Sequence, residues 1–141
     1  MAAPNIVNVT SIFGKTVAAA LDTTTTTDIL TCSADKVLKI NSIIVANKDG
    51  ANAATVTVQF YDNGTSTRFL IASTINVPAD TTLVVLGKDS PIYLEESDQI
   101  EAGASVNGDL DIIISYEELD DAYGVLNMSK YVGNRFGSMV P

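Results

Sequence analysis

Residues 54–75 read ATVTVQFYDNGTSTRFLIASTI and carry the clearest secondary-structure signal in the chain. Apolar and polar residues alternate from Val56 to Tyr61, which is the period of a half-buried β-strand. The Asp62-Asn63-Gly64 sequence that follows is typical of a tight hairpin turn, because Asn and Gly adopt positive φ angles readily. Arg68 to Ile75 is then the returning strand. The stretch therefore predicts two antiparallel strands joined by a short turn.

Similar runs lie on both sides of this hairpin, and each is bounded by Gly, Asp, Asn or Pro. They cover residues 16–21, 28–32, 37–47, 82–86, 92–94, 99–104 and 110–116. Turn signals that recur at such short spacing are typical of a sandwich or jelly roll. The predicted fold class is all-β: an antiparallel β-sandwich, jelly-roll-like, with extended N- and C-terminal arms.

Three parts of the chain follow from this pattern. The 141 residues suit one domain. We expect an N-terminal arm at residues 1–15, the sandwich at 16–121 and a C-terminal arm at 122–141. Leu110 to Tyr116 is almost continuously apolar, which predicts a central strand covered on both faces. Glu117 to Leu126 could form a short helix.

The charge of the chain argues against two classes of partner. Eight basic and seventeen acidic residues leave a net charge of −9. Such a chain repels nucleic-acid phosphates and anionic lipid headgroups, so we expect neither nucleic acid nor membrane as a partner. Residues 122–141 contain Lys130 and Arg135 and no acid. This segment could dock on an acidic neighbour; alternatively, the acidic body is simply a solvated surface.

The residue types that most enzymes use are scarce. Histidine is absent and Cys32 is the single cysteine, which removes the usual nucleophile systems and most transition-metal ligands. The acids at Glu95–Asp98 and Glu117–Asp121 lack the spacing of a dedicated calcium loop, although calcium binding there is left open. We expect no enzymatic activity and no cofactor. The N-terminus lacks the features of a secretory signal, so we expect the chain in a soluble compartment.

Four segments resemble small β-rich virion structural proteins of tailed phages, of the type found in phages of marine bacteria. They are Leu38–Asn47 (LKINSIIVAN), Ile75–Leu83 (INVPADTTL), Ile92–Asp98 (IYLEESD) and Ile114–Glu118 (ISYEE). The resemblance spans Val37 to Glu118. Where such proteins often show Glu-x-Gly-Asp, this chain has Glu95-Glu96-Ser97-Asp98.

The resemblance implies a non-enzymatic protein of the virion, made in the host cytoplasm before assembly. We expect a capsid decoration or cement protein whose partners are other virion proteins. A neck or collar protein and a tail or fibre-attachment protein are alternatives, and a carbohydrate-binding module on a fibre is an alternative of another class.

The arms are the predicted assembly elements, because they combine few strand signals with many apolar side chains. The expected contacts are Ile6, Val7, Ile12, Phe13, Tyr131, Val132, Arg135, Phe136, Met139 and Val140. A strand that is apolar on both faces needs more cover than one small domain supplies. We therefore expect a homo-oligomer, with a trimer slightly favoured.

Overall fold

The computed structural model describes residues 9–23 and 27–121. Within those ranges all the regular structure is β-strand, and none is helical. The strands are β1 (Val9–Ala20), β2 (Asp28–Thr31), β3 (Lys36–Asn47), β4 (Ala54–Asp62), β5 (Thr67–Val77), β6 (Thr82–Leu86), β7 (Ile92–Leu94), β8 (Gln99–Ala104) and β9 (Leu110–Asp121). The described part of the chain also contains no helix long and apolar enough to cross a membrane.

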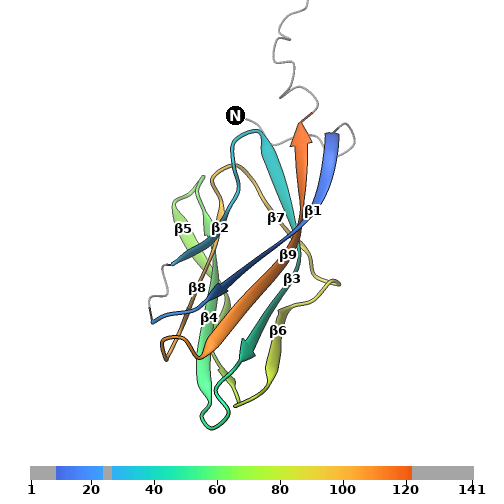
Figure 1. Ribbon diagram of the computed structural model, residues 1–141. Coiled ribbons are helices and arrows are strands. Elements are labelled where there is room, and N and C mark those ends of the chain that lie inside the picture. The colour runs from blue at the N-terminus through green and yellow to red at the C-terminus, as the bar shows by residue number, and fades with distance from the viewer. Residues whose placement is uncertain (1–8, 24–26, 122–141) are drawn as a thin grey trace, which may run out of the picture.

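The strands form two antiparallel sheets. The first has the order β1-β9-β3-β6, with β7 also paired to β3, and the second has the order β2-β8-β4-β5. Figure 1 shows β1, β9 and β3 running side by side, with β9 between the other two. The predicted antiparallel β-sandwich is confirmed.

The pairing is nested in the manner of a jelly roll. β6 pairs with Ile43 to Ala46 of β3 and β7 pairs with Leu38 to Ile40, so the two act as halves of one strand. The partners are then first with last (β1–β9), second with second-last (β2–β8), β3 with β6 and β7, and β4 with β5. A long hairpin folded over itself in this way gives two Greek keys. Its tip is the predicted hairpin, with the turn between Asp62 and Thr67.

The core lies between the sheets and is built from alternate residues. On β3 the side chains in the core are Leu38, Ile40, Ile43 and Val45, where a register shift between Ile40 and Ser42 moves the alternation by one residue. Those on β4 include Val56 and Val58. Successive side chains of a strand point to opposite faces, so one apolar set from each sheet meets in the middle. Each such side chain contributes about 1.5–3 kcal/mol on burial.

The predicted N-terminal arm is partly a strand. Residues 9–15, expected in the arm, form the first half of β1, and Lys15 pairs with Tyr116 of β9. The chain there is rich in β-branched residues, but Gly14 and exposed side chains obscure the alternation. Since β1 is an edge strand, its pairing with β9 holds it without much burial. Residues 1–8 and 122–141 lie outside the described residues.

Two expectations for the C-terminal strand are wrong. The helix considered for Glu117–Leu126 is absent at its start, because β9 continues to Asp121 with β1 on one side and β3 on the other. β9 is indeed central, but its two faces differ. Ile112 and Ile114 are buried in the core, whereas Ile113 faces outward and is only partly covered by this chain.

Candidate functional site

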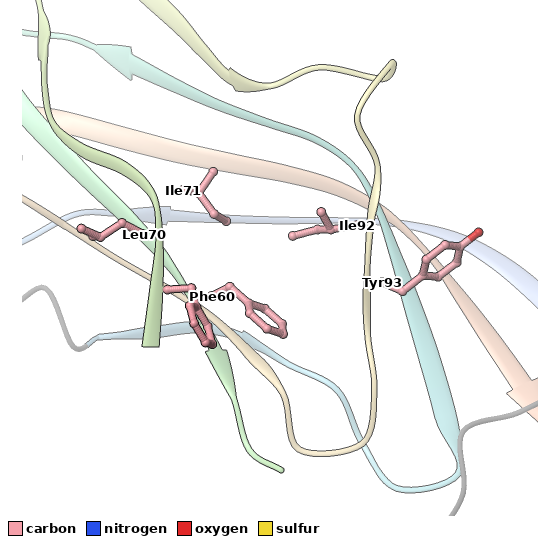
Figure 2. Close-up of a pocket in the computed structure, with 6 residues that line it drawn as sticks. Phe60, Leu70, Ile71, Ile92 and Tyr93 are labelled. Carbon is pink, nitrogen blue, oxygen red and sulfur yellow. The ribbon is translucent and has the colours of Figure 1, made fainter. Parts of the chain in front are cut away.

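An apolar groove opens on one flank of the sandwich. It has a volume of about 240 Å³. Its lining comprises Phe60 on β4, Phe69, Leu70 and Ile71 on β5, and Ile92 and Tyr93 on β7. Figure 2 shows the labelled side chains coming from two strands of one sheet and from β7 of the other. We call these six residues the flank groove.

The topology leaves this flank open. β5 is the edge of its sheet and pairs with β4, while β7 lies at the edge of the other sheet and pairs with β3. Among the described strands no ladder joins β5 to β7. β7 is also only three residues long, so it covers little of the space beside β5.

Several large, mainly apolar side chains of the flank groove are exposed to solvent. Phe69 is 53% exposed, Leu70 is 60% exposed and Tyr93 is 45% exposed. Three of the six aromatic residues in the described part of the chain, Phe60, Phe69 and Tyr93, line this groove. Exposed apolar patches mark interaction sites, and interface cores are enriched in aromatic residues and Arg.

A buried carboxylate holds an arginine beside the groove. Glu101 is 1% exposed, and its Oε1 accepts hydrogen bonds from Gln59 Nε2 at 2.7 Å and from Arg68 Nε at 2.8 Å. The Arg68 guanidinium lies 4.6 Å from the centre of the Tyr61 ring. The hydrogen bond to Glu101 raises the pKa of Arg68. The cation is therefore held over Glu101 on the outer face of its sheet, one residue before Phe69 in the chain.

The groove suits apolar side chains better than sugars. None of its six lining residues carries a charge, and the Tyr93 hydroxyl is its one polar side-chain group. Figure 2 shows this hydroxyl pointing away from the other labelled side chains. A sugar site needs convergent hydrogen-bonding groups as well as aromatic rings. The arrangement favours a protein ligand.

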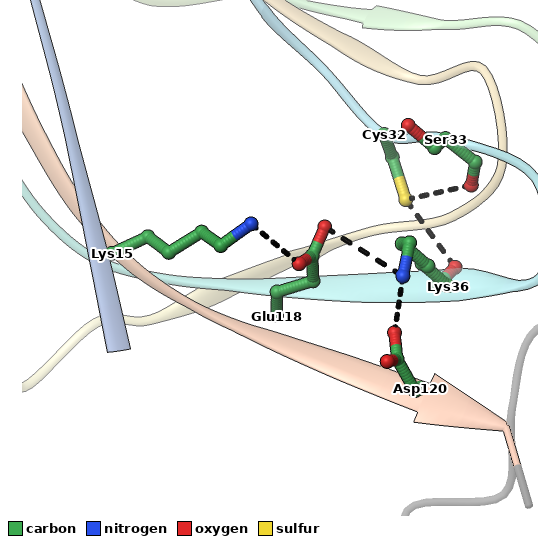
Figure 3. Close-up of polar contacts among 6 residues, drawn as sticks. All are labelled: Lys15, Cys32, Ser33, Lys36, Glu118 and Asp120. Carbon is green, nitrogen blue, oxygen red and sulfur yellow. Dashed lines mark hydrogen bonds and ion pairs between the residues drawn. The ribbon is translucent and has the colours of Figure 1, made fainter. Parts of the chain in front are cut away.

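A second polar cluster lies at the end of the sandwich where β9 ends and β1 begins. Glu118 accepts from Lys15 Nζ at 2.7 Å and lies 4.0 Å from Lys36 Nζ, which also pairs with Asp120 (Figure 3). These ion pairs raise the pKa of both lysines. The cluster links β1, β9 and β3, and its acids are those that the sequence offered as calcium ligands.

The other acidic cluster is also structural in the folded chain. Asp98 is 5% exposed, and its carboxylate accepts the backbone N–H groups of Asn63 and Glu95, each at 3.0 Å. In the described ranges no group of three or more His, Cys, Asp and Glu residues is placed to hold a metal ion.

Only two of the predicted assembly residues can be located. Ile12 is 59% exposed and Phe13 is 47% exposed, on β1, at the edge of its sheet opposite β6 and β7. The remaining ones, Ile6, Val7, Tyr131, Val132, Arg135, Phe136, Met139 and Val140, lie outside the described residues. The structure thus does not place Ile12 and Phe13 in the flank groove.

Sequence reasoning missed the flank groove, although one signal was present. Phe69, Leu70 and Ile71 are consecutive, and three successive residues of a strand cannot all face the core. An apolar run of this kind in the strand after a hairpin turn indicates either a buried central strand or a partner on the outside. Which of the two holds depends on whether another strand pairs with β5.

No protein-family model and no curated protein matches the chain. Among solved structures, it is similar to the CBM22-1 and GH10 modules of endo-1,4-beta-D-xylanase 10B from Clostridium thermocellum, solved with xylohexaose. That match has 11% identity and a TM-score of 0.30, and it covers 82% of this chain and 27% of the xylanase chain.

It is also similar to a chain of infectious bursal disease virus, Gx strain, with 11% identity and a TM-score of 0.33. This match covers 86% of the present chain and 45% of the viral one. The chain therefore spans less than half the length of either neighbour. At these identities and TM-scores, neither likeness bears on function.

Proposed function

We propose that this protein is a non-enzymatic structural protein of a tailed-phage particle, bound to the capsid as a decoration or cement protein. The observation that carries the proposal is the flank groove, an exposed apolar surface on a jelly roll. The resemblance of residues 37–118 to virion proteins of tailed phages supplies the particle context. The proposed partner is the major capsid protein, and the proposed location is the virion.

An exposed apolar surface of this kind becomes buried when the protein assembles with its neighbours. Each large apolar side chain that a neighbour covers contributes about 1.5–3 kcal/mol before ordering costs. One such contact is weak, but many copies on a lattice turn weak contacts into durable attachment. A groove without charges also lets an acidic domain approach another protein without burying unpaired carboxylates. Outward-facing Ile113 of β9 is consistent with a homo-oligomer, for which we retain the trimer.

Location in the particle separates this proposal from its nearest alternative. We expect mass spectrometry of purified particles of the encoding phage to detect the chain in many copies, and electron microscopy to place it on the icosahedral lattice. Density at the neck, collar or tail would replace decoration by the alternative position. Absence of the chain from purified particles would refute the virion proposal altogether.

Substitution in the groove tests the surface itself. Leu70→Ser is expected to reduce incorporation into particles by about tenfold or more, because an anchoring apolar contact is lost. Val84→Ser is the matched control, since Val84 is 61% exposed on β6 and is not among the lining residues. Equal incorporation of both variants would show that the flank groove is not the attachment surface.

A further inference from the structure

We infer that Asn63, in the turn between β4 and β5, is a site of spontaneous deamidation, and that Asn107 resists the same reaction in the folded protein. Asn-Gly pairs favour this reaction, because glycine has no Cβ to hinder the approach of its backbone nitrogen to the asparagine side chain. The chain contains two such pairs, Asn63-Gly64 and Asn107-Gly108. All four residues are exposed, so exposure does not distinguish the two sites. The inference does not depend on the proposed function.

The reaction consumes water and needs no other reagent. The backbone nitrogen of Gly64 attacks Cγ of Asn63 and forms an N–Cγ bond. The Cγ–Nδ2 bond breaks, and the departing amine takes the proton of the Gly64 N–H and leaves as ammonia. Water then opens the succinimide ring at either carbonyl, which gives aspartate or isoaspartate. The asparagine side chain must therefore be free to approach the glycine nitrogen, and that nitrogen must lose its proton.

The Asn63 turn meets both conditions. Among the described residues the Asn63 side chain makes no hydrogen bond. The Gly64 N–H donates to Oδ1 of Asp62 at 2.9 Å, and a carboxylate at this distance is a base within reach of the proton that must leave. The backbone N–H of Asn63 donates to Oδ1 of Asp98 at 3.0 Å. This bond lies on the other side of the Asn63 Cα from the reacting groups, so it does not restrain them.

At Asn107 both reacting groups are bound to another segment of the chain. The Asn107 Oδ1 accepts the backbone N–H of Thr23 at 2.8 Å, and the Gly108 N–H donates to the backbone oxygen of Leu21 at 2.9 Å. A peptide carbonyl is not a base at neutral pH, so it holds the Gly108 proton without removing it. The attack requires both hydrogen bonds to break, which slows the reaction by about tenfold or more.

Modification of Asn63 alters the tip of the sandwich. It replaces a neutral amide by a carboxylate next to Asp62, in a chain whose net charge is already −9. Isoaspartate also adds a methylene group to the backbone, directly after the N–H that Asp98 accepts. The change therefore falls where the β4–β5 turn meets the loop that follows β7.

Incubation of the full-length protein at mildly alkaline pH, followed by peptide mass spectrometry, tests the inference. The fractions of aspartate and isoaspartate at both sites are measured over time, in the folded protein and in urea. Folded protein should convert Asn63 about tenfold or more faster than Asn107. In urea the two sites should convert at similar rates, because each is followed by glycine and neither is held by the fold.

Two variants connect the reaction at Asn63 to its surroundings. Gly64→Ala should slow the conversion of Asn63 by about tenfold, because the added Cβ hinders the attacking nitrogen. The fold tolerates this change, since the Cβ would meet only the flexible Asp62 carboxylate, at 3.3 Å. Asp62→Asn keeps an oxygen that accepts the Gly64 N–H but removes the base, and it should also slow the conversion by about tenfold.

Four results would each overturn the inference. They are equal rates at the two sites in folded protein, faster conversion of Asn107, a preference for Asn63 that persists in urea, and an undiminished rate in Asp62→Asn. The first three would show that the fold does not select the site, and the fourth would show that Asp62 does not promote the reaction. None of these measurements involves phage particles, so they stand apart from the test of the proposed function.

Discussion

Arg68 stabilises the fold although its side chain is 45% exposed. Its guanidinium is the cation for Glu101, a carboxylate that is 1% exposed on the outer side of its sheet. Removing one partner of such a pair leaves a buried charge without compensation, which is strongly destabilising. The pair also keeps the end of β5 closed against β4 and β8, next to the flank groove.

Arg68→Ala is therefore expected to lower the melting temperature by on the order of 10 °C. Glu101→Gln should cost less, because the arginine that it leaves is 45% exposed and water can solvate it. Lys48→Ala is the control, since it breaks an exposed ion pair with Asp111 and should shift the melting temperature by only about 2–3 °C. Thermal unfolding followed by circular dichroism measures all three. Equal shifts for Arg68→Ala and Lys48→Ala would contradict the role given to Glu101.

Cys32 is expected to be an unreactive thiol in the folded protein. It is 1% exposed, and its Sγ lies 3.3 Å from the backbone oxygen of Lys36. Burial raises the pKa of the Cys32 thiol to about 11. Because the thiolate is the reactive form, a disulfide reagent at pH 8 should label the folded protein hardly at all and the urea-unfolded protein completely. Rapid labelling without urea would show that this end of the sandwich opens.

The same pKa shift has a defined sign for stability. The folded state holds the thiol proton more tightly than the unfolded state, whose cysteine keeps the ordinary pKa of 9.0. The contribution of Cys32 to stability is thus complete below about pH 9 and is lost as the pH rises towards about 11.

At the scale of the elements, one loop organises the tip of the jelly roll. The turn after β7 ends in Asp98, whose carboxylate joins the backbone of Glu95 to that of Asn63 in the β4–β5 turn. The backbone of the same loop also bonds to Cys32 after β2. Three connections that are distant in sequence therefore meet at the Glu95–Asp98 loop, two of them at the Asp98 carboxylate and the third at its backbone.

Asp98→Ala should accordingly destabilise the protein by about 2–3 kcal/mol, since two backbone N–H groups lose their acceptor in a buried position. Asp98→Asn retains one oxygen acceptor and should cost about half as much. Urea denaturation at pH 7 measures both free energies of unfolding. A loss below about 0.5 kcal/mol for the alanine variant would mean that water replaces the carboxylate.

The elements differ in how far the sequence predicts them. The β4–β5 hairpin is confirmed, because its turn chemistry and its alternating pattern are both local. The limits of β1 and β9 were wrong, since each strand extends where its neighbour holds it. The acids at the end of β9 lie in a strand that is paired with β1 and β3, and Lys15 and Lys36 form ion pairs with Glu118 and Asp120 there.

At the scale of the whole molecule, the domain and the C-terminal segment should be separable. The nine strands of the described residues lie between Val9 and Asp121, and the core side chains lie in the same range. Deleting Asn127–Pro141 is expected to leave the circular dichroism spectrum and the melting temperature nearly unchanged, while the shortened protein no longer joins the particle. An unfolded product, or one that incorporates normally, would count against this division.

The all-β class, the antiparallel sandwich, the hairpin turn that begins at Asp62 and the scarcity of catalytic residue types could all be predicted from the amino-acid sequence. Those properties depend on turn chemistry, on the two-residue period of side chains and on composition, which are local or additive. Two features became visible only in the folded structure: β5 and β7 are edge strands beside an open flank, and Glu101 is buried beneath Arg68. Strand order depends on contacts between residues far apart in the chain, so the same apolar run, Phe69 to Ile71, would be core in one order and is surface in this one.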